Sequence, residues 1–206
     1  MSYSQNNEEQ VIVDYFKGKV GTFLDVGAND GLTLSNTRRL MELKWSGVCV
    51  EPSPTAFKKL KENTAQFQQF QKVYCYNFAL GTSNGKVKMW DSGTHLNNGD
   101  HGLLSTINSS EKERWPGQVY EEIEVQCYRW KTFLNRLSVK EFSFISLDIE
   151  GCDVQVLKQI DLRNTELLCI EWNGNENIKQ QILEYTSGYG MSSVIYTSPE
   201  NLIISR

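Results

Sequence analysis

The sequence predicts a doubly wound α/β protein, in which helices cover both faces of a mostly parallel β-sheet. Three observations support this prediction. Apolar strand-like segments alternate with helical ones, the first strand runs into a corner with two glycines, and only three residues join the last two strands. No repeat, low-complexity tract or linker divides the 206 residues, a length that suits one α/β domain. We therefore expect a single domain over residues 1–206.

The individual elements are predicted from apolar runs and from helical spacing. An N-terminal helix is expected within residues 1–20, because Val11, Ile12, Tyr15 and Phe16 share one helical face. Strands are expected at 22–26, 47–51, 72–80, 86–90, 121–130, 142–149, 166–172, 192–197 and 201–205. Helices are expected at 32–44, 54–67, 131–139, 153–161 and 176–190.

Two connections are informative about topology. The turn "TSNG" predicts that strand 86–90 returns antiparallel from strand 72–80. The three residues "SPE" between the final two strands are too few for a crossover helix, so the last strand should run antiparallel to its neighbour.

Residues 91–118 break the alternation. They are rich in Gly, Asn, Ser and Asp and show little periodicity. A loop of this length inside a compact domain is usually a functional lid or partly disordered. We expect a long loop or lid insertion here.

Composition narrows the class of protein. A net charge of -4 argues against a protein whose main function is to bind nucleic acid through its phosphates. The polar start is unlike a signal peptide, and no apolar run approaches the about 18 residues of a membrane span. Five cysteines without CxxC spacing favour neither a disulfide framework nor a zinc site. We expect a reduced, cytoplasmic protein with no metal bound through cysteine.

The stretch "FLDVGANDG" (23–31) is the first candidate binding element. Gly27 and Gly31 would let the backbone approach a ligand closely, at the edge of the sheet where ligands bind in this fold class. Because Asn29 stands where the dinucleotide fingerprint needs a glycine, a nucleoside-like ligand fits better than a pyrophosphate. The alternative is that both glycines serve only helix–strand packing.

Glu51 ends the second predicted strand and is followed by "PSP". A carboxylate at this position is the usual group that accepts hydrogen bonds from both hydroxyls of a ribose. The alternative is that Glu51 only interacts with the dipole of the following helix. Together with the glycine corner, Glu51 predicts a nucleoside site.

The motifs "FLDVGANDG", "VEPSP", "NFALGTSNGKV" and "FISLDIEGCD" occur in the order and spacing of one known family. With them the chain resembles the FkbM-type S-adenosylmethionine-dependent methyltransferases, and its first 60 residues look like the Star-like subgroup. The resemblance runs from about Ser4 to Trp172. It implies a Rossmann-like class I methyltransferase fold: a seven-stranded, mostly parallel sheet with an antiparallel last strand and helices on both faces.

The resemblance also implies which residues bind the cofactor, S-adenosyl-L-methionine. Those expected around its methionine part are Asp25, Gly27, Ala28, Asn29 and Gly31. Glu51 would bind the ribose hydroxyls, and Asn77 and Phe78 would lie beside the adenine. Asp148 would lie near the methyl sulfonium.

Three residues are candidates for catalysis: Asp148, Glu150 and His101. In the family the fourth-strand motif reads roughly K-x-D-x-E-G-x-E, whereas here Ser146 replaces the basic residue and Asp153 the second Glu. Glu150 is the better general-base candidate, since neighbouring carboxylates raise its pKa by repulsion. His101, in the predicted lid, has a suitable intrinsic pKa, as does His95. The alternatives are that Glu150 and Asp153 only begin the following helix, and that both histidines are exposed polar residues of a loop.

Two further possibilities stay open. Asp148 and Glu171, with Asp100 or His101, would make an oxygen-rich Mg²⁺ site, although no metal-ligand spacing stands out and we predict no metal. Trp115, Trp130 and Trp172 would suit stacking on a sugar ring, or belong to the core.

The sequence thus predicts a methyltransferase acting on a hydroxyl of a glycan or small molecule, with no nucleic-acid partner and no membrane span. One rival is a scaffold module that keeps the fold without catalysis. Another is a nucleic-acid methyltransferase. Enzymes that methylate the amino groups of bases carry an (N/D)PP(Y/F) motif at this position, where this chain has "DIEG". A nucleotide-dependent oxidoreductase lacks its phosphate-binding glycine.

Overall fold

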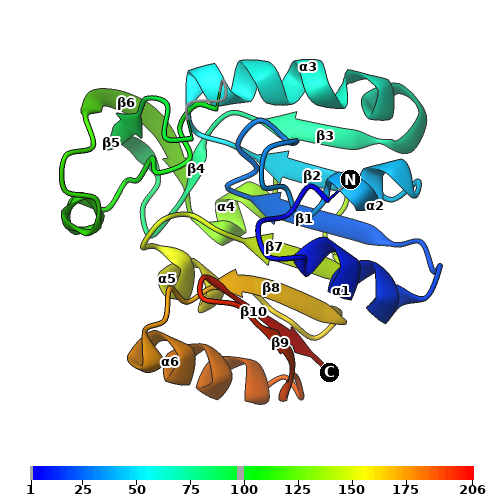
Figure 1. Cartoon of the computed structure of the whole chain (residues 1–206). Helices are drawn as coiled ribbons and strands as arrows, with labels where there is room; N and C mark the ends of the chain where they lie inside the picture. Colours follow the sequence, from blue (N-terminus) through cyan, green and yellow to red (C-terminus); the bar gives the residue numbers. More distant parts are fainter. Residues whose placement is uncertain (1, 97–99) are drawn as a thin grey trace.

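A seven-stranded sheet forms the centre of the protein, with strand order β3-β2-β1-β7-β8-β10-β9 (Figure 1). The structure is a computed structural model that describes residues 2–96 and 100–206. The strands are β1 (Thr22–Val26), β2 (Ser46–Val50), β3 (Val73–Tyr76), β7 (Phe144–Leu147), β8 (Leu167–Glu171), β9 (Ser193–Thr197) and β10 (Asn201–Ser205). Strands β3, β2, β1, β7 and β8 are parallel, whereas β10 runs antiparallel to both β8 and β9.

Six helices of the described chain cover the two faces of this sheet. They are α1 (Glu8–Phe16), α2 (Arg38–Glu42) and α3 (Pro54–Gln71), then α4 (Trp130–Leu134), α5 (Asp153–Leu157) and α6 (Glu176–Ser187). Successive residues of a strand point to opposite faces. Phe23 accordingly belongs to the core cluster under α1–α3, and Leu24 to the cluster under α4–α6. The inner strands β1, β2, β7, β8 and β10 are buried on both faces because both faces are covered, whereas the edge strand β9 is exposed.

The register places the strand ends at one edge. Val26, the last residue of β1, pairs with Val50 of β2 and with Leu147 of β7. The residues that follow these three strands therefore emerge side by side. They form the edge at which ligands bind in open parallel sheets.

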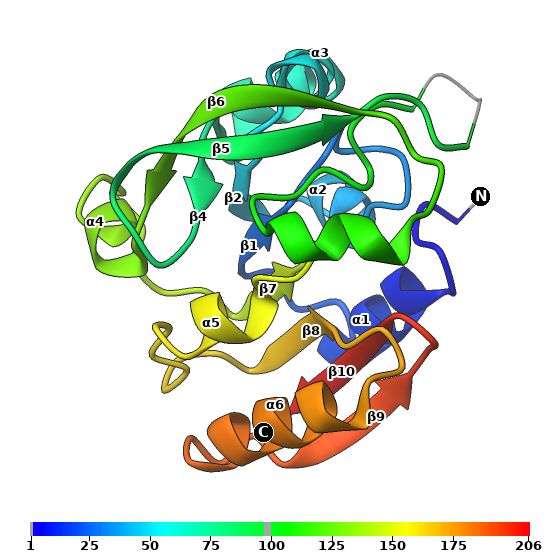
Figure 2. The same cartoon turned by 90° about the vertical axis from the view of Figure 1, so that its left-hand side faces the viewer.

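A second sheet of three strands lies over this edge. It consists of β4 (Ala79–Leu80), β6 (Tyr120–Tyr128) and β5 (Gly85–Ser92), in the order β4-β6-β5. Between β5 and β6 the chain forms a 3-10 helix, η1 (Ser109–Arg114). Figure 2 shows η1 in front of the carboxyl ends of β1 and β7.

The predicted fold class and closing strands are confirmed, since β9 and β10 form an antiparallel pair. The predicted helix over 32–44 is wrong in extent, because α2 begins only at Arg38. The Asp30 carboxylate accepts hydrogen bonds from the amides of Leu32 and Thr33 (2.8 and 2.7 Å), and Leu34 is left-handed (φ 54°). Such local side-chain bonds compete with a helix.

The expected strand 72–80 is also wrong, since it is divided between the two sheets. β3 ends at Tyr76, and β4 pairs with β6 in the second sheet. The Asn77 side-chain amide donates to the carbonyl oxygens of Glu51 (2.8 Å) and Pro52 (3.0 Å), which holds the chain at the break. Strand β5 consequently pairs antiparallel with β6 and not, as expected, with the preceding strand.

The segment 91–118 has more structure than its composition suggests. Asp91 and Ser92 continue β5, and Trp90 and Thr106 form a two-way backbone bridge (2.9 and 3.1 Å). Helix η1 follows. Residues 97–99 of the expected lid lie outside the described part of the chain. Within that part, none of the helices is long and apolar enough to cross a membrane.

Helix α1 is expected to contribute strongly to stability through Phe16. This ring is 3% exposed and packs edge-on against Trp45, with centroids 4.6 Å apart. Phe16→Ala should lower the free energy of unfolding by about 3–5 kcal/mol in chemical denaturation. Phe70 on α3 is 79% exposed, so Phe70→Ala should change it by less than about 0.5 kcal/mol. Equal losses of unfolding free energy in Phe16→Ala and Phe70→Ala would show that α1 is not part of the core.

Candidate functional site

A cavity of about 640 Å³ lies at the carboxyl edge of the main sheet, beneath segment 102–107 and residues 114–115. Ligand cavities usually measure about 300–1,000 Å³. Eight of the residues predicted from the sequence line it: Asp25, Gly27, Ala28, Asn29, Glu51, Phe78, Asp148 and Glu150. They come from four strands or their following turns, so the fold brings together most of the predicted site.

The corner after β1 is fixed by main-chain contacts. The amides of Gly27 and Ala28 donate to the carbonyl oxygen of Val50 (3.0 and 3.1 Å), and the amide of Asp148 donates to that of Val26 (3.0 Å). A Cβ atom at Gly27 would lie 1.6 Å from the carbonyl oxygen of Asp148, and its φ is +84°. Only glycine fits this crossing of chains.

Glu51 is held by amides from the turns after β1 and β2. Its carboxylate accepts hydrogen bonds from the amide of Asn29 (2.9 Å) and from that of Ser53 (2.7 Å). The side chain is 4% exposed. Burial raises the pKa of Glu51 from 4.5 to about 8, partly offset by the two amides, while Asp91 and Asp25 add repulsion. The group thus presents a fixed oxygen acceptor at the cavity wall.

Asp25 lies on β1 beneath the corner. Its carboxylate accepts a hydrogen bond from the Thr37 hydroxyl, just before α2. Burial raises the pKa of Asp25 to about 7, against the effect of the Thr37 bond, and Asp148 adds repulsion.

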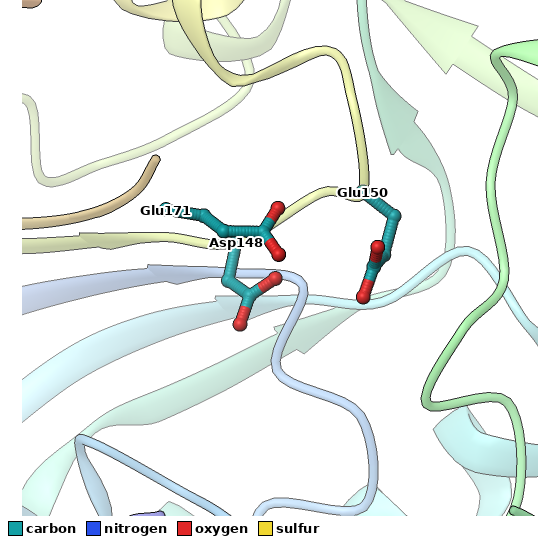
Figure 3. A group of neighbouring side chains, drawn as sticks. All are labelled: Asp148, Glu150 and Glu171. Atoms are coloured by element: carbon teal, nitrogen blue, oxygen red, sulfur yellow. The ribbon is translucent and has the colours of Figure 1, made fainter. Parts of the chain in front are cut away.

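Three carboxylates meet at the end of β7 and β8 (Figure 3). Asp148, Glu150 and Glu171 each bring an oxygen atom within 4.8 Å of the others. Burial raises the pKa of Asp148 to about 6, and Arg114 opposes this increase. Burial, followed by repulsion from Asp148, raises the pKa values of Glu150 and Glu171 well above 4.5. The three carboxyl groups therefore hold protons to a higher pH than exposed carboxyl groups do.

This cluster differs from the Mg²⁺ set considered from the sequence. Glu150 joins Asp148 and Glu171, whereas the Asp100 carboxylate accepts hydrogen bonds from the amides of His95 (2.7 Å) and Leu96 (3.0 Å). Carboxylates gathered in a cleft do not by themselves define a metal site. We assign no metal to them.

Three predicted residues do not line the cavity: Gly31, Asn77 and His101. A Cβ at Gly31 would lie 2.6 Å from Leu60 of α3, so the structure supports the packing alternative for this glycine. Asn77 is exposed and bonds to the main chain after β2. His101 contributes its carbonyl oxygen, which accepts a hydrogen bond from the Asn29 side chain (2.7 Å).

Several lining residues were not predicted as site residues from the sequence. They include Gln5, Arg114 and Glu200. Glu171, His95, Trp115 and Trp172 also line the cavity; the sequence had offered them only as alternative metal, base or sugar-stacking residues. Trp130 lies in the core instead. Arg114 belongs to a segment without periodicity, so no pattern could have placed it at the cavity. The "CIEW" end of β8, which repeats the strand-end acid of β2 and β7, was the signal for Glu171 and Trp172.

Comparisons with known proteins bear on this geometry. Residues 25–191 match the model of the methyltransferase FkbM domain. The structure is similar to methyltransferase FkbM from Methylobacillus flagellatus, with 12% identity and a TM-score of 0.59, over 91% of this chain and 44% of that one. The chain thus spans less than half of that protein. Comparison with curated protein sequences finds no match.

Two further structures have a similar fold. A protein of the NADB-Rossmann superfamily from Streptococcus agalactiae shows 11% identity and a TM-score of 0.53, over 100% of this chain and 70% of that one. A putative RNA methyltransferase from Pyrococcus horikoshii shows 10% identity and a TM-score of 0.52, over 97% and 82%. At such identities the likeness establishes the fold alone.

The Gly27 crossing is expected to be intolerant of any side chain. Gly27→Ala should lower the free energy of unfolding by about 3 kcal/mol or more, because the methyl group would force β1 and β7 apart. Gly18 has nearly the same φ (+81°), but nothing lies within 4 Å of its Cβ position. Gly18→Ala should therefore cost only the about 1–2 kcal/mol of a left-handed alanine. Comparable losses in denaturation curves would contradict the steric account.

Stability of the unliganded protein should fall as the pH rises. Folding raises the pKa of Asp25 and Asp153 from 3.8 to about 7, and that of Glu51 from 4.5 to about 8. Between these values the native state holds more protons than the unfolded chain, so the contribution of these three groups is full below about pH 4 and is lost as the pH rises through 8. Each such group contributes about 1.4 kcal/mol per pH unit over its range, so we expect the unfolding free energy to be several kcal/mol lower at pH 8 than at pH 5.

The matched control for this pH dependence is Glu51→Gln, which removes one of the titrating groups. Its loss of stability between pH 5 and pH 8 should be smaller than that of the unmodified protein. A stability that increases over this range would contradict the raised pKa values.

Proposed function

We propose that this chain, which belongs to the methyltransferase FkbM domain family, transfers a methyl group from S-adenosylmethionine to a hydroxyl of a glycan or another small molecule. The observation that carries the proposal is the cavity in which Gly27, Glu51 and Asp148 meet at the carboxyl edge of the sheet. The family supports methyltransferase activity and cofactor use in general. The hydroxyl acceptor and the residue roles are our proposal.

The cavity fits the cofactor. Gly27 lines the cavity with its main chain, and Asp25, Ala28 and Asn29 beside it would surround the methionine part. The Glu51 carboxylate would accept the ribose hydroxyls, and the Phe78 ring would lie beside the adenine. S-adenosylmethionine, when bound, supplies a methyl group on a positively charged sulfur.

The acidic cluster suits a positively charged ligand. Asp148 lines the same cavity as Gly27 and would lie near the charged sulfur. Glu150 is our candidate for the base that accepts the proton of the acceptor hydroxyl. Its raised pKa brings proton exchange closer to neutral pH than for an exposed glutamate. His101, whose side chain does not line the cavity, remains a weaker candidate.

The charge of the cavity also favours a neutral acceptor. Its lining includes Glu51, Asp148, Glu150, Glu171 and Glu200. Among the described residues, the only Lys or Arg that lines it is Arg114. Such a wall repels phosphates, which disfavours nucleic acid. The rings of Trp115 and Trp172 would suit the apolar face of a sugar.

A cytoplasmic location is part of the proposal. All five cysteines, within the described chain, are unpaired thiols. This state fits a reducing compartment.

Glu51→Gln is the variant that tests the ribose assignment. It should weaken binding of both S-adenosylmethionine and S-adenosylhomocysteine by about 10–100-fold, because a carboxyl group with two acceptor oxygens for the ribose is replaced by an amide with one. The measurement is calorimetric titration, with circular dichroism to confirm folding. Glu124→Gln, at an exposed ion pair with Lys86, is the matched control and should bind normally. Unchanged affinity in a folded Glu51→Gln protein would remove the assignment.

An acceptor screen separates the enzyme from the scaffold alternative. The purified protein is incubated with methyl-labelled S-adenosylmethionine and a panel of neutral glycans and small alcohols, with RNA and DNA as further arms. We expect label on a neutral hydroxyl compound. Cofactor binding without transfer to any acceptor would favour the scaffold, and label on nucleic acid would contradict the neutral acceptor.

A further inference from the structure

We propose that Arg114 is a positioning residue, which holds the Glu150 carboxylate at the cavity through an ion pair between η1 and the turn after β7. The turn comprises residues 148–152. The inference rests on the proposed function, in which Glu150 is the candidate base. It assigns a role to η1, a helix outside the main sheet.

The turn after β7 has a strained backbone that needs support. Glu150 (φ 49°) and Gly151 (φ +88°) are consecutive left-handed residues. The Asp153 carboxylate accepts hydrogen bonds from the amides of Ile149 (3.0 Å) and Gly151 (3.2 Å). A left-handed glutamate is costly and persists only where its surroundings fix it. The direction of the Glu150 side chain thus depends on contacts to the turn.

The segment between β5 and η1 supplies such contacts to the main chain. The Thr106 hydroxyl donates to the carbonyl oxygen of Glu150 (2.7 Å), and the Asn108 side-chain amide donates to that of Gly151 (3.2 Å). A Cβ at Gly151 would lie 2.5 Å from the Glu111 carboxylate, so η1 packs directly on the turn. These contacts fix the backbone of the turn, but none of them involves the Glu150 carboxylate.

Arg114 is the group that holds this carboxylate. Its Nη1 atom lies 3.5 Å from Oε2 of Glu150, and it also pairs with Glu111. The Glu150 Oε2 atom is buried and accepts no hydrogen bond within the described chain. The Glu150 side chain is 12% exposed and that of Arg114 is 35% exposed. An ion pair in such surroundings is screened less than one on the surface.

Arg114 is the main positive charge near Glu150. The titratable and charged groups that act on it are Asp148, Asp153, Glu171, Glu111, Arg114 and Tyr120. Among them Arg114 is the single cation. It opposes the effect of burial and of the neighbouring carboxylates on the pKa of Glu150, and on that of Asp148.

The test uses the ratio of the affinities for S-adenosylmethionine and S-adenosylhomocysteine, measured by calorimetry from pH 5 to pH 9. The two probes differ in the positive charge on sulfur, so their ratio reports the charge of the nearby carboxylates and needs no acceptor. In the unmodified protein the ratio should rise with pH as the cluster ionises. Arg114→Gln should move the midpoint of this rise upward by about 1 pH unit, since the opposite charge is lost.

Three variants show whether Arg114 acts through Glu150. Arg114→Lys should have a midpoint pH close to that of the unmodified protein, because it keeps the positive charge. Lys112→Gln removes the same charge from the same helix, where the Lys112 ammonium lies 4.5 Å from the Trp90 ring centroid, and should leave the midpoint in place. In a Glu150→Gln background, Arg114→Gln should shift the midpoint by less than half as much.

The outcomes distinguish this inference from the proposed function. Binding of both probes by all folded variants, with the same midpoint in Arg114→Gln as in the unmodified protein, would overturn the role of Arg114 alone. So would an equal shift with and without the Glu150 side chain. If the folded, unmodified protein binds neither probe, the proposed cofactor fails, and with it the inference.

Discussion

The absence of a side chain at Gly27 allows the turn after β1 to touch the carbonyl oxygen of Asp148, and the site depends on this contact. A Cβ atom here would lie 1.6 Å from that oxygen. With glycine, β1 and β7 end together, and their neighbours β2 and β8 bring Glu51 and Glu171 to the same edge. Four separate strand ends thereby contribute to one cavity.

Concentrating carboxylates at one edge has an electrostatic cost. Burial raises the pKa values of Asp25 to about 7, of Glu51 to about 8 and of Asp148 to about 6. The fold reduces the cost with hydrogen bonds from main-chain amides and from Thr37, and with the charge of Arg114. A bound cation would reduce it further, so stability and affinity for a positively charged ligand depend on the same groups.

The main sheet was predictable from its apolar strands, and Gly27 and Glu51 from the glycine corner and the acid at a strand end. Asp25, Ala28, Asn29, Phe78 and Asp148 were implied by the resemblance to the family, and the structure places them at the same cavity. Helix α2 was predicted too long, since Asp30 bonds to nearby amides and Leu34 is left-handed. The second sheet and Arg114 were missed, because β4, β5, β6 and η1 are arranged by contacts between distant residues. Such contacts leave no periodic pattern in the chain.

The most direct test of the central claim is a crystal structure of the protein with S-adenosylhomocysteine. The account predicts that the ligand occupies the cavity, with both ribose hydroxyls within hydrogen-bond distance of the Glu51 carboxylate and the sulfur toward Asp148. The turn at Gly27 should keep its contact with the Asp148 carbonyl oxygen. A ligand bound elsewhere, or in this cavity without contact to Glu51, would contradict the account.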